Sequence, residues 1–118
     1  PGQTGADFTG RLGGYDFDNA ILRDASFRKT EYAGASFRGA DMVGADMRGS
    51  DGAGADFCGA DLRSVDFTDA RLTGVMFCDA DGENGAIIDG ATLFDDSAIE
   101  LLTDVNRAYV ERMRKAGA

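Results

Sequence analysis

The sequence predicts an all-β solenoid, in which short repeated units stack into coils, followed by a C-terminal helix. The first observation is a five-residue repeat that runs unbroken from Leu12 to Gly82, with an apolar residue at nearly every fifth position. A period of five is neither helical nor that of a strand, so it indicates a repeat architecture. The second observation is that small residues, mostly alanine, stand two positions before each apolar one. The third is that helical spacing replaces the repeat after Leu93.

A period of twenty residues lies inside the period of five. It is clearest in four phenylalanines: Phe17, Phe37, Phe57 and Phe77. Twenty residues make four units of five, so a coil of four units would place these rings above one another. Adjacent coils of a solenoid lie ~4.8 Å apart, and aromatic pairs add ~0.5–1.5 kcal/mol to the burial of their area. We therefore predict that the four rings form a stack in the core.

The small residues and the glycines have separate physical reasons. A narrow coil has room for one large and one small side chain on each face, which predicts the alanine column: Ala20, Ala25, Ala35, Ala40, Ala45, Ala55, Ala60, Ala70 and Ala80. Four glycines recur at a spacing of twenty: Gly14, Gly34, Gly54 and Gly74. Glycine adopts the positive φ that some tight turns require without steric cost, so these residues are expected at the corners of a coil.

Six units show the repeat most clearly. They are Ala25-Ser26-Phe27-Arg28-Lys29, Ala35-Ser36-Phe37-Arg38-Gly39, Ala40-Asp41-Met42-Val43-Gly44, Ala45-Asp46-Met47-Arg48-Gly49, Ala55-Asp56-Phe57-Cys58-Gly59 and Ala60-Asp61-Leu62-Arg63-Ser64. The sequence resembles the pentapeptide-repeat family over residues 6–94, because the unit of that family is Ala-Asp/Asn-Leu/Phe-X-X. The resemblance implies a right-handed quadrilateral β-helix with four units per coil and about four to five coils. Residues 1–94 are assigned to this β-helix.

The repeat loses its frame at both ends. Ala6-Asp7-Phe8 is one residue out of frame with Leu12, which predicts an irregular first coil or a deletion near Thr9. Ala86-Ile87-Ile88 and Ala91-Thr92-Leu93 are out of frame in the other sense, so residues 81–85 are expected to form a bulge or small loop. In the middle, Gly52 leaves a core position empty, and we expect Tyr32 or Leu72 to lean into it.

Residues 95–118 are predicted to form one C-terminal capping helix. Ser97 and Glu100 have the spacing of a capping box, with Ser97 as the N-cap. An apolar face follows at helical spacing: Ile99, Leu102, Val105, Tyr109 and Met113. Such a face would cover the last coil and its unpaired strand edge. Two other roles stay open. The helix would also suit a homodimer or a partner, and so would the exposed N-terminal coil edge near Phe8 and Leu12.

Composition argues against most chemistry. The 118 residues include 17 glycines and no histidine, and the net charge is −9. Without histidine, neither the cysteines nor the serines have the general base that a nucleophile needs. We therefore expect no catalytic, cofactor-binding or metal-binding residues, and no enzyme. The negative charge disfavours direct binding of nucleic acid, and no apolar stretch is long enough to span a membrane.

Cys58 and Cys78 occupy the same outward slot one coil apart. Their Cα atoms would then lie ~4.8 Å apart, within the range of a disulfide. A bridge would indicate an oxidising compartment, either the periplasm, the cell exterior or a thylakoid lumen. Free thiols would fit the cytoplasm. Both alternatives stay open, and so does the removal of a targeting segment upstream of Pro1.

The outward slots of the predicted coils suggest where a partner would bind. The slot of Gly13, Ala33, Ala53 and Thr73 lies beside the glycine column and is nearly free of side-chain bulk. We call these four residues the bare face. A smooth face allows another protein to approach the backbone closely. The sequence therefore favours a non-catalytic interaction or structural module, such as an accessory subunit of a larger assembly, with photosynthetic complexes of the thylakoid lumen among the candidates.

The alternative function rests on the acidic residues. Asp46, Asp56 and Asp66 belong to a run of aspartates in successive units and would form an acidic stripe. Pentapeptide-repeat proteins that protect DNA gyrase are similar in fold and acidity, and they imitate DNA. This resemblance implies a DNA mimic that binds a topoisomerase. Arginines such as Arg38 and Arg48 alternate with the aspartates and weaken that hypothesis.

Overall fold

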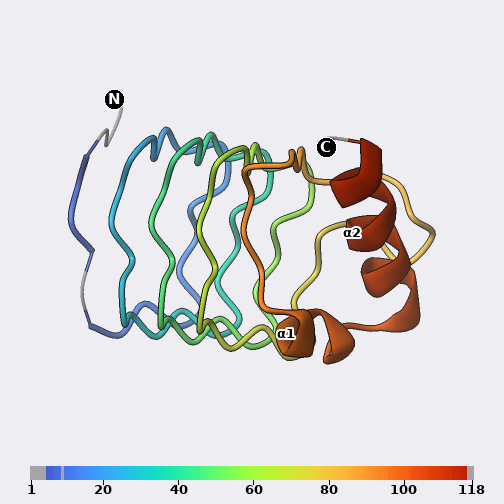
Figure 1. The fold of residues 1–118 in the computed structure, drawn as a ribbon. Coiled ribbons are helices and arrows are strands. Elements are labelled where there is room, and N and C mark those ends of the chain that lie inside the picture. The colour runs from blue at the N-terminus through green and yellow to red at the C-terminus, as the bar shows by residue number, and fades with distance from the viewer. Residues whose placement is uncertain (1–4, 9, 117–118) are drawn as a thin grey trace.

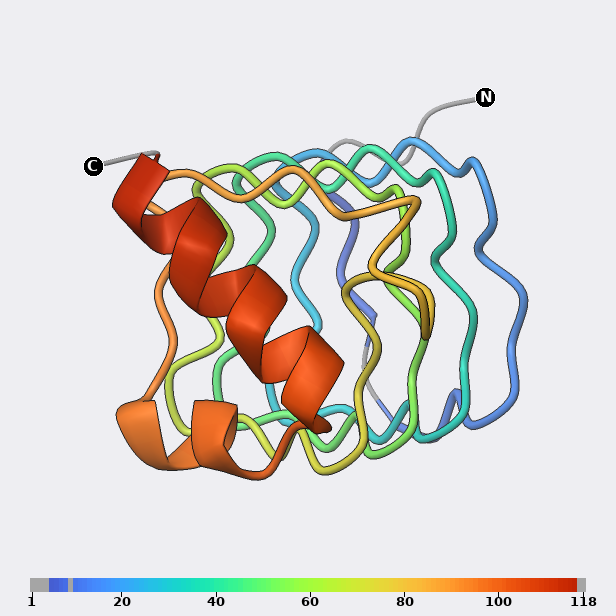
Figure 2. The same ribbon diagram turned by 90° about the vertical axis from the view of Figure 1, so that its right-hand side faces the viewer.

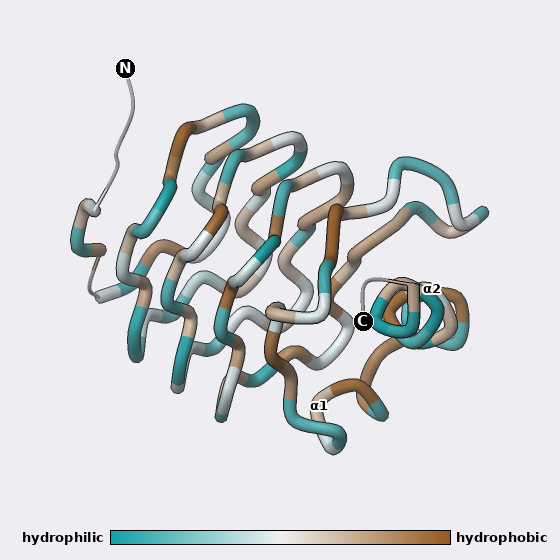
Figure 3. Tube along the Cα trace, turned by 45° about the horizontal axis from the view of Figure 1, so that its top comes forward, coloured by the Kyte–Doolittle hydropathy of each residue, from teal (hydrophilic) through white to brown (hydrophobic). Residues whose placement is uncertain are grey.

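The chain winds into a stack of coils with two helices across its C-terminal end (Figure 1). This computed structural model describes residues 5–8 and 10–116. The helices are α1, Asp96–Glu100, and α2, Asp104–Ala116. The coils are held together by isolated parallel β-bridges rather than by long strands. Hydrophilic and hydrophobic segments alternate along each coil, as the tube in Figure 3 shows.

Most bridges join a residue to the one twenty positions later, and they line up in four columns, each named by its first residue. The Asp7 column holds Asp7, Ser26, Asp46, Asp66 and Leu93; the Arg11 column holds Arg11, Glu31, Asp51 and Arg71; the Asp16 column holds Asp16, Ser36, Asp56 and Met76; and the Ile21 column holds Ile21, Asp41, Asp61 and Ile87. One coil therefore contains four five-residue units, and each unit contributes one bridge residue.

One unit shows how the backbone of a coil is satisfied. The N–H of the core residue Phe37 donates to the carbonyl of Asp56 in the next coil at 2.7 Å, and the N–H of Asp56 donates back to Ala35 at 3.0 Å. The unit then turns, with Gly39 at φ 68° and the N–H of Ala40 bonded to the Phe37 carbonyl at 3.1 Å. Because these donors are assigned to residues of an adjacent coil or of the same turn, the register of the stack is fixed.

Aromatic rings stack in two parts of the core. The rings of Phe17, Phe37, Phe57 and Phe77 lie nearly parallel, with successive centroids 5.0, 4.9 and 5.8 Å apart. A second stack, which we did not single out from the sequence, belongs to the Asp7 column. Phe8 lies on Phe27 at 4.7 Å, and Phe67 on Phe94 at 5.2 Å. The two stacks meet edge to face, as in the 5.6 Å contact of Phe57 with Phe67, which is a favoured aromatic geometry.

Tyr32 fills the core position that Gly52 leaves empty. A Cβ on Gly52 would collide with the Tyr32 ring, so the glycine makes room for a side chain that reaches up from the coil below. The buried hydroxyl of Tyr32 lies 3.0 Å from the Ser50 hydroxyl. Burial raises the pKa of Tyr32 well above its usual value. The Tyr32 side chain thus occupies its own core position and the one that Gly52 leaves empty.

The predictions for the two irregular ends of the repeat are confirmed in part. The step from Asp7 to Ser26 is 19 residues, one short of the regular step, and the step from Asp61 to Ile87 is 26, which leaves a six-residue loop around Asp81. Ala80 and Gly82 lie in this loop and not in the columns. Ala86-Ile87-Ile88 adopts the predicted positions, but Ala91-Thr92-Leu93 does not. Thr92 takes the buried small position and Leu93 becomes the half-exposed bridge residue, because the Phe94 ring stacks on Phe67.

The prediction of one helix with Ser97 as N-cap is wrong. Ser97 lies within α1, whose N-cap Asp95 makes no side-chain capping bond. The chain leaves α1 at Leu101, whose carbonyl accepts the Gly74 N–H at 3.4 Å and so continues the ladder of the coils. A new helix begins after Thr103, whose hydroxyl accepts the Asn106 N–H at 3.4 Å. Residues of both helices and of the link between them join the core: Ala98, Ile99, Leu102, Tyr109 and Val110. Val105 is exposed.

Replacing Phe57 by alanine should destabilise the protein by ~3–5 kcal/mol, because the surrounding rings cannot collapse into the space that is lost. The free energy of unfolding, measured in urea by far-ultraviolet circular dichroism, tests this. Thr68→Ala, at a partly exposed outward position, is the control and should change stability by less than ~0.5 kcal/mol. A loss below ~1 kcal/mol for Phe57→Ala would contradict the stacked core.

Candidate interaction surface

The bare face lies along one line of corners on the solenoid. Gly13, Ala33 and Thr73 are exposed and Ala53 is half-buried. The glycine that follows each of them has a φ between 67° and 72°, as the turn requires. A Cβ on any of these four glycines would meet no atom within 4 Å. The corner is therefore open to solvent, and a partner can reach the backbone without meeting a long side chain.

The backbone beneath the bare face is rigid. The N–H of Gly34 donates to the carbonyl of Ala53 at 3.0 Å, and the N–H of Gly54 donates to that of Thr73 at 2.9 Å. The same ladder ends on Leu101 after α1, and the Leu101 side chain is 55% exposed. A surface of this kind loses little conformational entropy on binding, because it is already fixed by hydrogen bonds.

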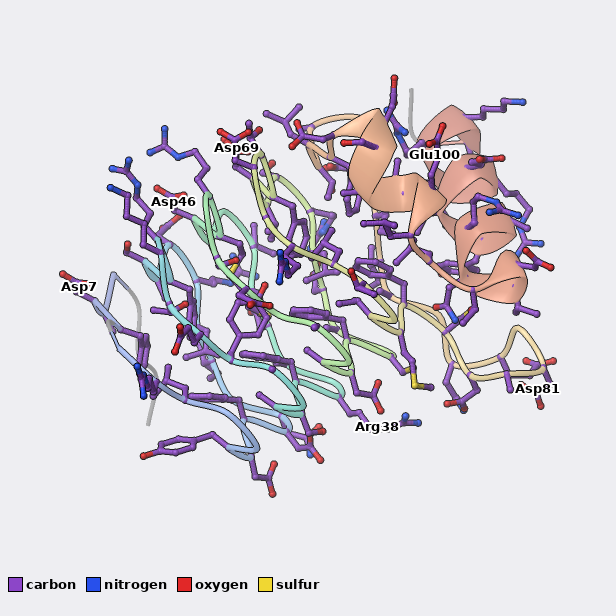
Figure 4. The ribbon with its side chains drawn as sticks, turned by 90° about the horizontal axis from the view of Figure 1, so that it is seen from below. Asp7, Arg38, Asp46, Asp69, Asp81 and Glu100 are labelled. Atoms are coloured by element: carbon purple, nitrogen blue, oxygen red, sulfur yellow. The ribbon has the colours of Figure 1, made fainter. Side chains whose placement is uncertain are left out.

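The predicted acidic stripe does not form as one surface. Asp46 and Asp66 are neighbours in the Asp7 column, whereas Asp56 belongs to the Asp16 column. The reason is the coil itself, since residues ten apart lie two units, and therefore two columns, away from each other. Figure 4 shows Asp46 and Arg38, the ion-pair partner of Asp56, on opposite sides of the solenoid.

The repeated aspartates have a structural role in the turns. In each regular unit the side chain of the bridge aspartate accepts the N–H of the residue two positions later, as Asp56 does from Cys58 at 2.9 Å and Asp66 from Thr68 at 2.9 Å. Asp46 does the same for Arg48 at 3.1 Å. This is the local bond that makes aspartate favourable in turns. The acidity of the chain is thus largely explained by its folding.

Arginines neutralise much of this acidity. Arg48 lies 2.8 Å from Asp46, and Arg63 lies 2.7 Å from Asp61. The hydrogen bonds from these guanidinium groups hold the pKa of Asp46 and of Asp61 below the usual range. Arg38 bridges Asp56 at 2.8 Å and Asp79 at 3.2 Å. The arginines therefore interrupt any continuous negative field along the solenoid.

Cys58 and Cys78 are both buried, and neither forms a disulfide in the structure. Burial, reinforced by the neighbouring Asp56 carboxylate, raises the pKa of the Cys58 thiol far above its usual value. Burial also raises the pKa of Cys78. Because the thiolate is the reactive form, both cysteines are poor nucleophiles in the folded protein.

Asn106 of α2 ends the Asp16 column, and sequence reasoning missed it. Its Oδ1 accepts the N–H of Phe77 at 2.5 Å, for which no further coil exists. It also accepts the N–H of Cys78 at 3.0 Å, which lacks a bridge aspartate because Met76 stands at that position. Its Nδ2 donates to Thr103 at 3.0 Å. Tyr109, one turn later, donates its hydroxyl to the Ala86 carbonyl at 2.6 Å. A buried asparagine on the apolar side of a capping helix was the available signal.

Across the described residues, no group of three or more His, Cys, Asp or Glu side chains is arranged to hold a metal ion. Neither α1 nor α2 is long and apolar enough to cross a membrane. The surface thus presents the bare face, a set of paired charges and the helical end as its main features.

A family model for pentapeptide repeats, in eight copies, matches residues 11–51 and 53–77. The chain belongs to the pentapeptide-repeat family. Its fold also resembles the crystal structure of a pentapeptide repeat protein from the thylakoid lumen of Arabidopsis thaliana. The two share 33% sequence identity with a TM-score of 0.63, over 84% of this chain and 72% of the other. No match is found among curated proteins. Family membership accounts for the repeat, the coil and the regular turns.

Asn106→Ala should destabilise this pentapeptide-repeat protein by ~1–3 kcal/mol, because it leaves two buried N–H groups without an acceptor. Urea denaturation measures the loss, and amide hydrogen exchange of Phe77 and Cys78 localises it. Arg107→Ala, which breaks an exposed ion pair on the same helix, is the matched control and should cost less than ~0.5 kcal/mol. Equal effects of the two substitutions would show that Asn106 does not end the column.

Stability should fall in acid. The folded pKa values of Asp46 and Asp61 lie below the ordinary value of 3.8. Their contribution to stability is therefore fully present above that pH and is lost as the pH falls below it, through the lowered folded values. Urea midpoints measured from about pH 6 to about pH 2 test this. The double variant Arg48→Gln/Arg63→Gln should lose less stability over the same interval, since its carboxylates lack those partners. Parallel curves for both proteins would contradict the assignment.

Proposed function

We propose that this protein is a non-catalytic interaction module that binds another protein through the bare face. The single observation that carries the proposal is the line of open corners at Gly13, Ala33, Ala53 and Thr73, over a backbone already fixed by the ladder. We infer the right-handed quadrilateral form that the family resemblance implies, in which four flat faces meet at such corners. The lack of histidine leaves the buried thiols and the serines without a base, which supports a binding role over catalysis.

The structural neighbour supports a setting for this role. That protein comes from a thylakoid lumen and shares 33% identity with this chain. We therefore propose that the module is an accessory subunit of an assembly in a photosynthetic lumen. The six-residue loop around Asp81 and the helical end (Figures 1 and 2) give such a subunit features that a plain solenoid lacks.

Imitation of DNA is the second candidate, and the net charge of −9 favours it. A DNA mimic needs a continuous row of negative charges on one side. Here Asp46 and Asp56 lie in different columns, and Arg38 and Arg48 pair with them at 2.8 Å. The charge distribution therefore supports this candidate less well than the bare face supports the first.

Ala33→Arg and Ala53→Arg, made together, should reduce capture of the partner at least tenfold while leaving the thermal midpoint unchanged, because the new side chains project from exposed corners and prevent close approach. The measurement is affinity capture from an extract of thylakoid lumen, quantified by mass spectrometry. Val43→Arg, in the equivalent slot of the Ile21 column, is the matched control. Undiminished capture by the double variant would remove the bare face from the mechanism. Inhibition of gyrase supercoiling by the wild type would instead support imitation of DNA.

A further inference from the structure

The C-terminal helices complete only part of the last coil. α2 crosses the end of the solenoid, with α1 beside its start (Figure 2). Asn106 accepts the N–H groups that end the Asp16 column, and Tyr109 donates to the carbonyl of Ala86 at the end of the Ile21 column. For the Phe77 N–H and the Ala86 carbonyl, these side chains supply the hydrogen-bond partner that the next coil would have supplied. Among residues 5–8 and 10–116, no side chain does this for the Asp7 column.

The regular register shows which backbone groups remain at the end of the Asp7 column. One coil below, the N–H of Asp66 donates to the carbonyl of Ala45 at 3.2 Å, and the N–H of Met47 donates to the carbonyl of Asp66 at 2.9 Å. The corresponding groups in the last unit are the carbonyl of Thr92 and the N–H of Phe94. Within the described part of the chain, neither group has a hydrogen-bond partner. They form a strand edge with one donor and one acceptor at the spacing of a parallel bridge.

This edge lines a groove. The groove has a volume of about 540 Å³ and lies between the last unit and the C-terminal half of α2, with Thr92, Leu93 and Phe94 on one side and Glu111, Arg114 and Lys115 on the other. A volume of this size is typical of sites that bind small ligands or short segments. The side chain of Leu93 is 50% exposed.

The groove also holds the end of an aromatic stack. The ring of Phe94 packs on Phe67 at 5.2 Å and meets Phe77 edge to face at 5.5 Å, and Phe94 is only partly buried. In every lower coil the Asp7 column continues with another large side chain. A further aromatic ring above Phe94 would extend the stack by one step.

Charged side chains of both signs line the groove. Asp89 also lies in the groove, but its Oδ1 already accepts hydrogen bonds from Ser64, Ala91 and Thr92. Arg114 has a loose contact of 3.7 Å with Asp96. Lys115 forms no ion pair among the described residues. Glu111 also lines the groove, so its two cations face two acids. The two cations at the end of α2 are available to a carboxylate at the bridge position, where the Asp7 column itself carries Asp46 and Asp66.

We propose that this groove binds an extended peptide segment of a partner protein, in which an acidic residue is followed by an aromatic one. The N–H of the acidic residue donates to the Thr92 carbonyl, and its carbonyl accepts the Phe94 N–H, which adds one parallel bridge to the solenoid. The aromatic ring stacks on Phe94, and the carboxylate is attracted by Arg114 and Lys115. The segment thus imitates the next unit of the repeat. This surface is separate from the bare face, so either can exist without the other.

Peptides test the proposal without altering the protein. The probe is a fluorescent, end-blocked peptide with the sequence of residues 64–68, Ser-Val-Asp-Phe-Thr, which is the unit beneath the groove. Its affinity is measured by fluorescence anisotropy. Methylating the backbone nitrogen of its aspartate should weaken binding about tenfold or more, since this removes one hydrogen bond and adds a clash at the edge. Methylating the nitrogen of its phenylalanine should change little, because that N–H points away from the coil.

Protein variants test the charged wall. Arg114→Glu/Lys115→Glu should weaken binding of the same peptide about tenfold, whereas the matched pair Arg28→Glu/Lys29→Glu, at the other end of the solenoid, should not. Circular dichroism verifies that each variant is folded. The proposal is overturned by a lack of saturable binding at about 1 mM peptide, or by equal affinities of the two methylated peptides. It is also overturned if the protein forms a dimer that the peptide disrupts, because the groove then belongs to a second copy.

Discussion

The parallel hydrogen bonds between coils are the interaction on which the rest of the structure depends. They fix the distance between coils and force residues twenty apart into one column, so the side chains have no independent choice of neighbours. Phe37 therefore meets Phe57, and Gly52 must be matched by Tyr32. The ladder also explains why exposed positions matter so little to folding. Outward-pointing residues lie outside the core, so the bare face can be stripped of side chains while the core below it is unchanged.

The sequence predicted the fold correctly where the five-residue period was strict. It could not predict the fold where two adjacent residues were equally suited to the core. The coil follows from positions such as Phe37 and Phe57, because only a stacked repeat buries residues at that spacing. Leu93 and Phe94 are adjacent and both apolar, so periodicity could not tell which one enters the core; the aromatic stack decides it. The end of α1 at Leu101 depends on a backbone bond to Gly74, which lies 27 positions earlier and leaves no local signal. Asn106 was hidden for the same reason, since its partners belong to another part of the chain.

The candidate surfaces were likewise predictable from the sequence in one case and not in the other. The bare face could be named from the sequence because it is a property of one column. The acidic stripe could not, because it combined residues from columns that the coil separates. Charge counted along the chain gave a misleading impression of a negative surface. In the structure, Arg38, Arg48 and Arg63 form ion pairs with the aspartates. Several of those aspartates also accept the backbone hydrogen bonds that form the turns.

The constant step of twenty residues has a consequence for how such a protein changes in evolution. Duplication of one coil lengthens the molecule by about 4.8 Å and leaves both ends and every existing contact as they were. The length of the solenoid can thus change in fixed increments of one coil, to match the distance between two sites on a partner. A duplication whose length is not a multiple of twenty shifts all later columns to a new side, unless the excess is extruded at a corner, as the loop around Asp81 is. Selection can therefore change the length of the solenoid and the chemistry of its surface independently.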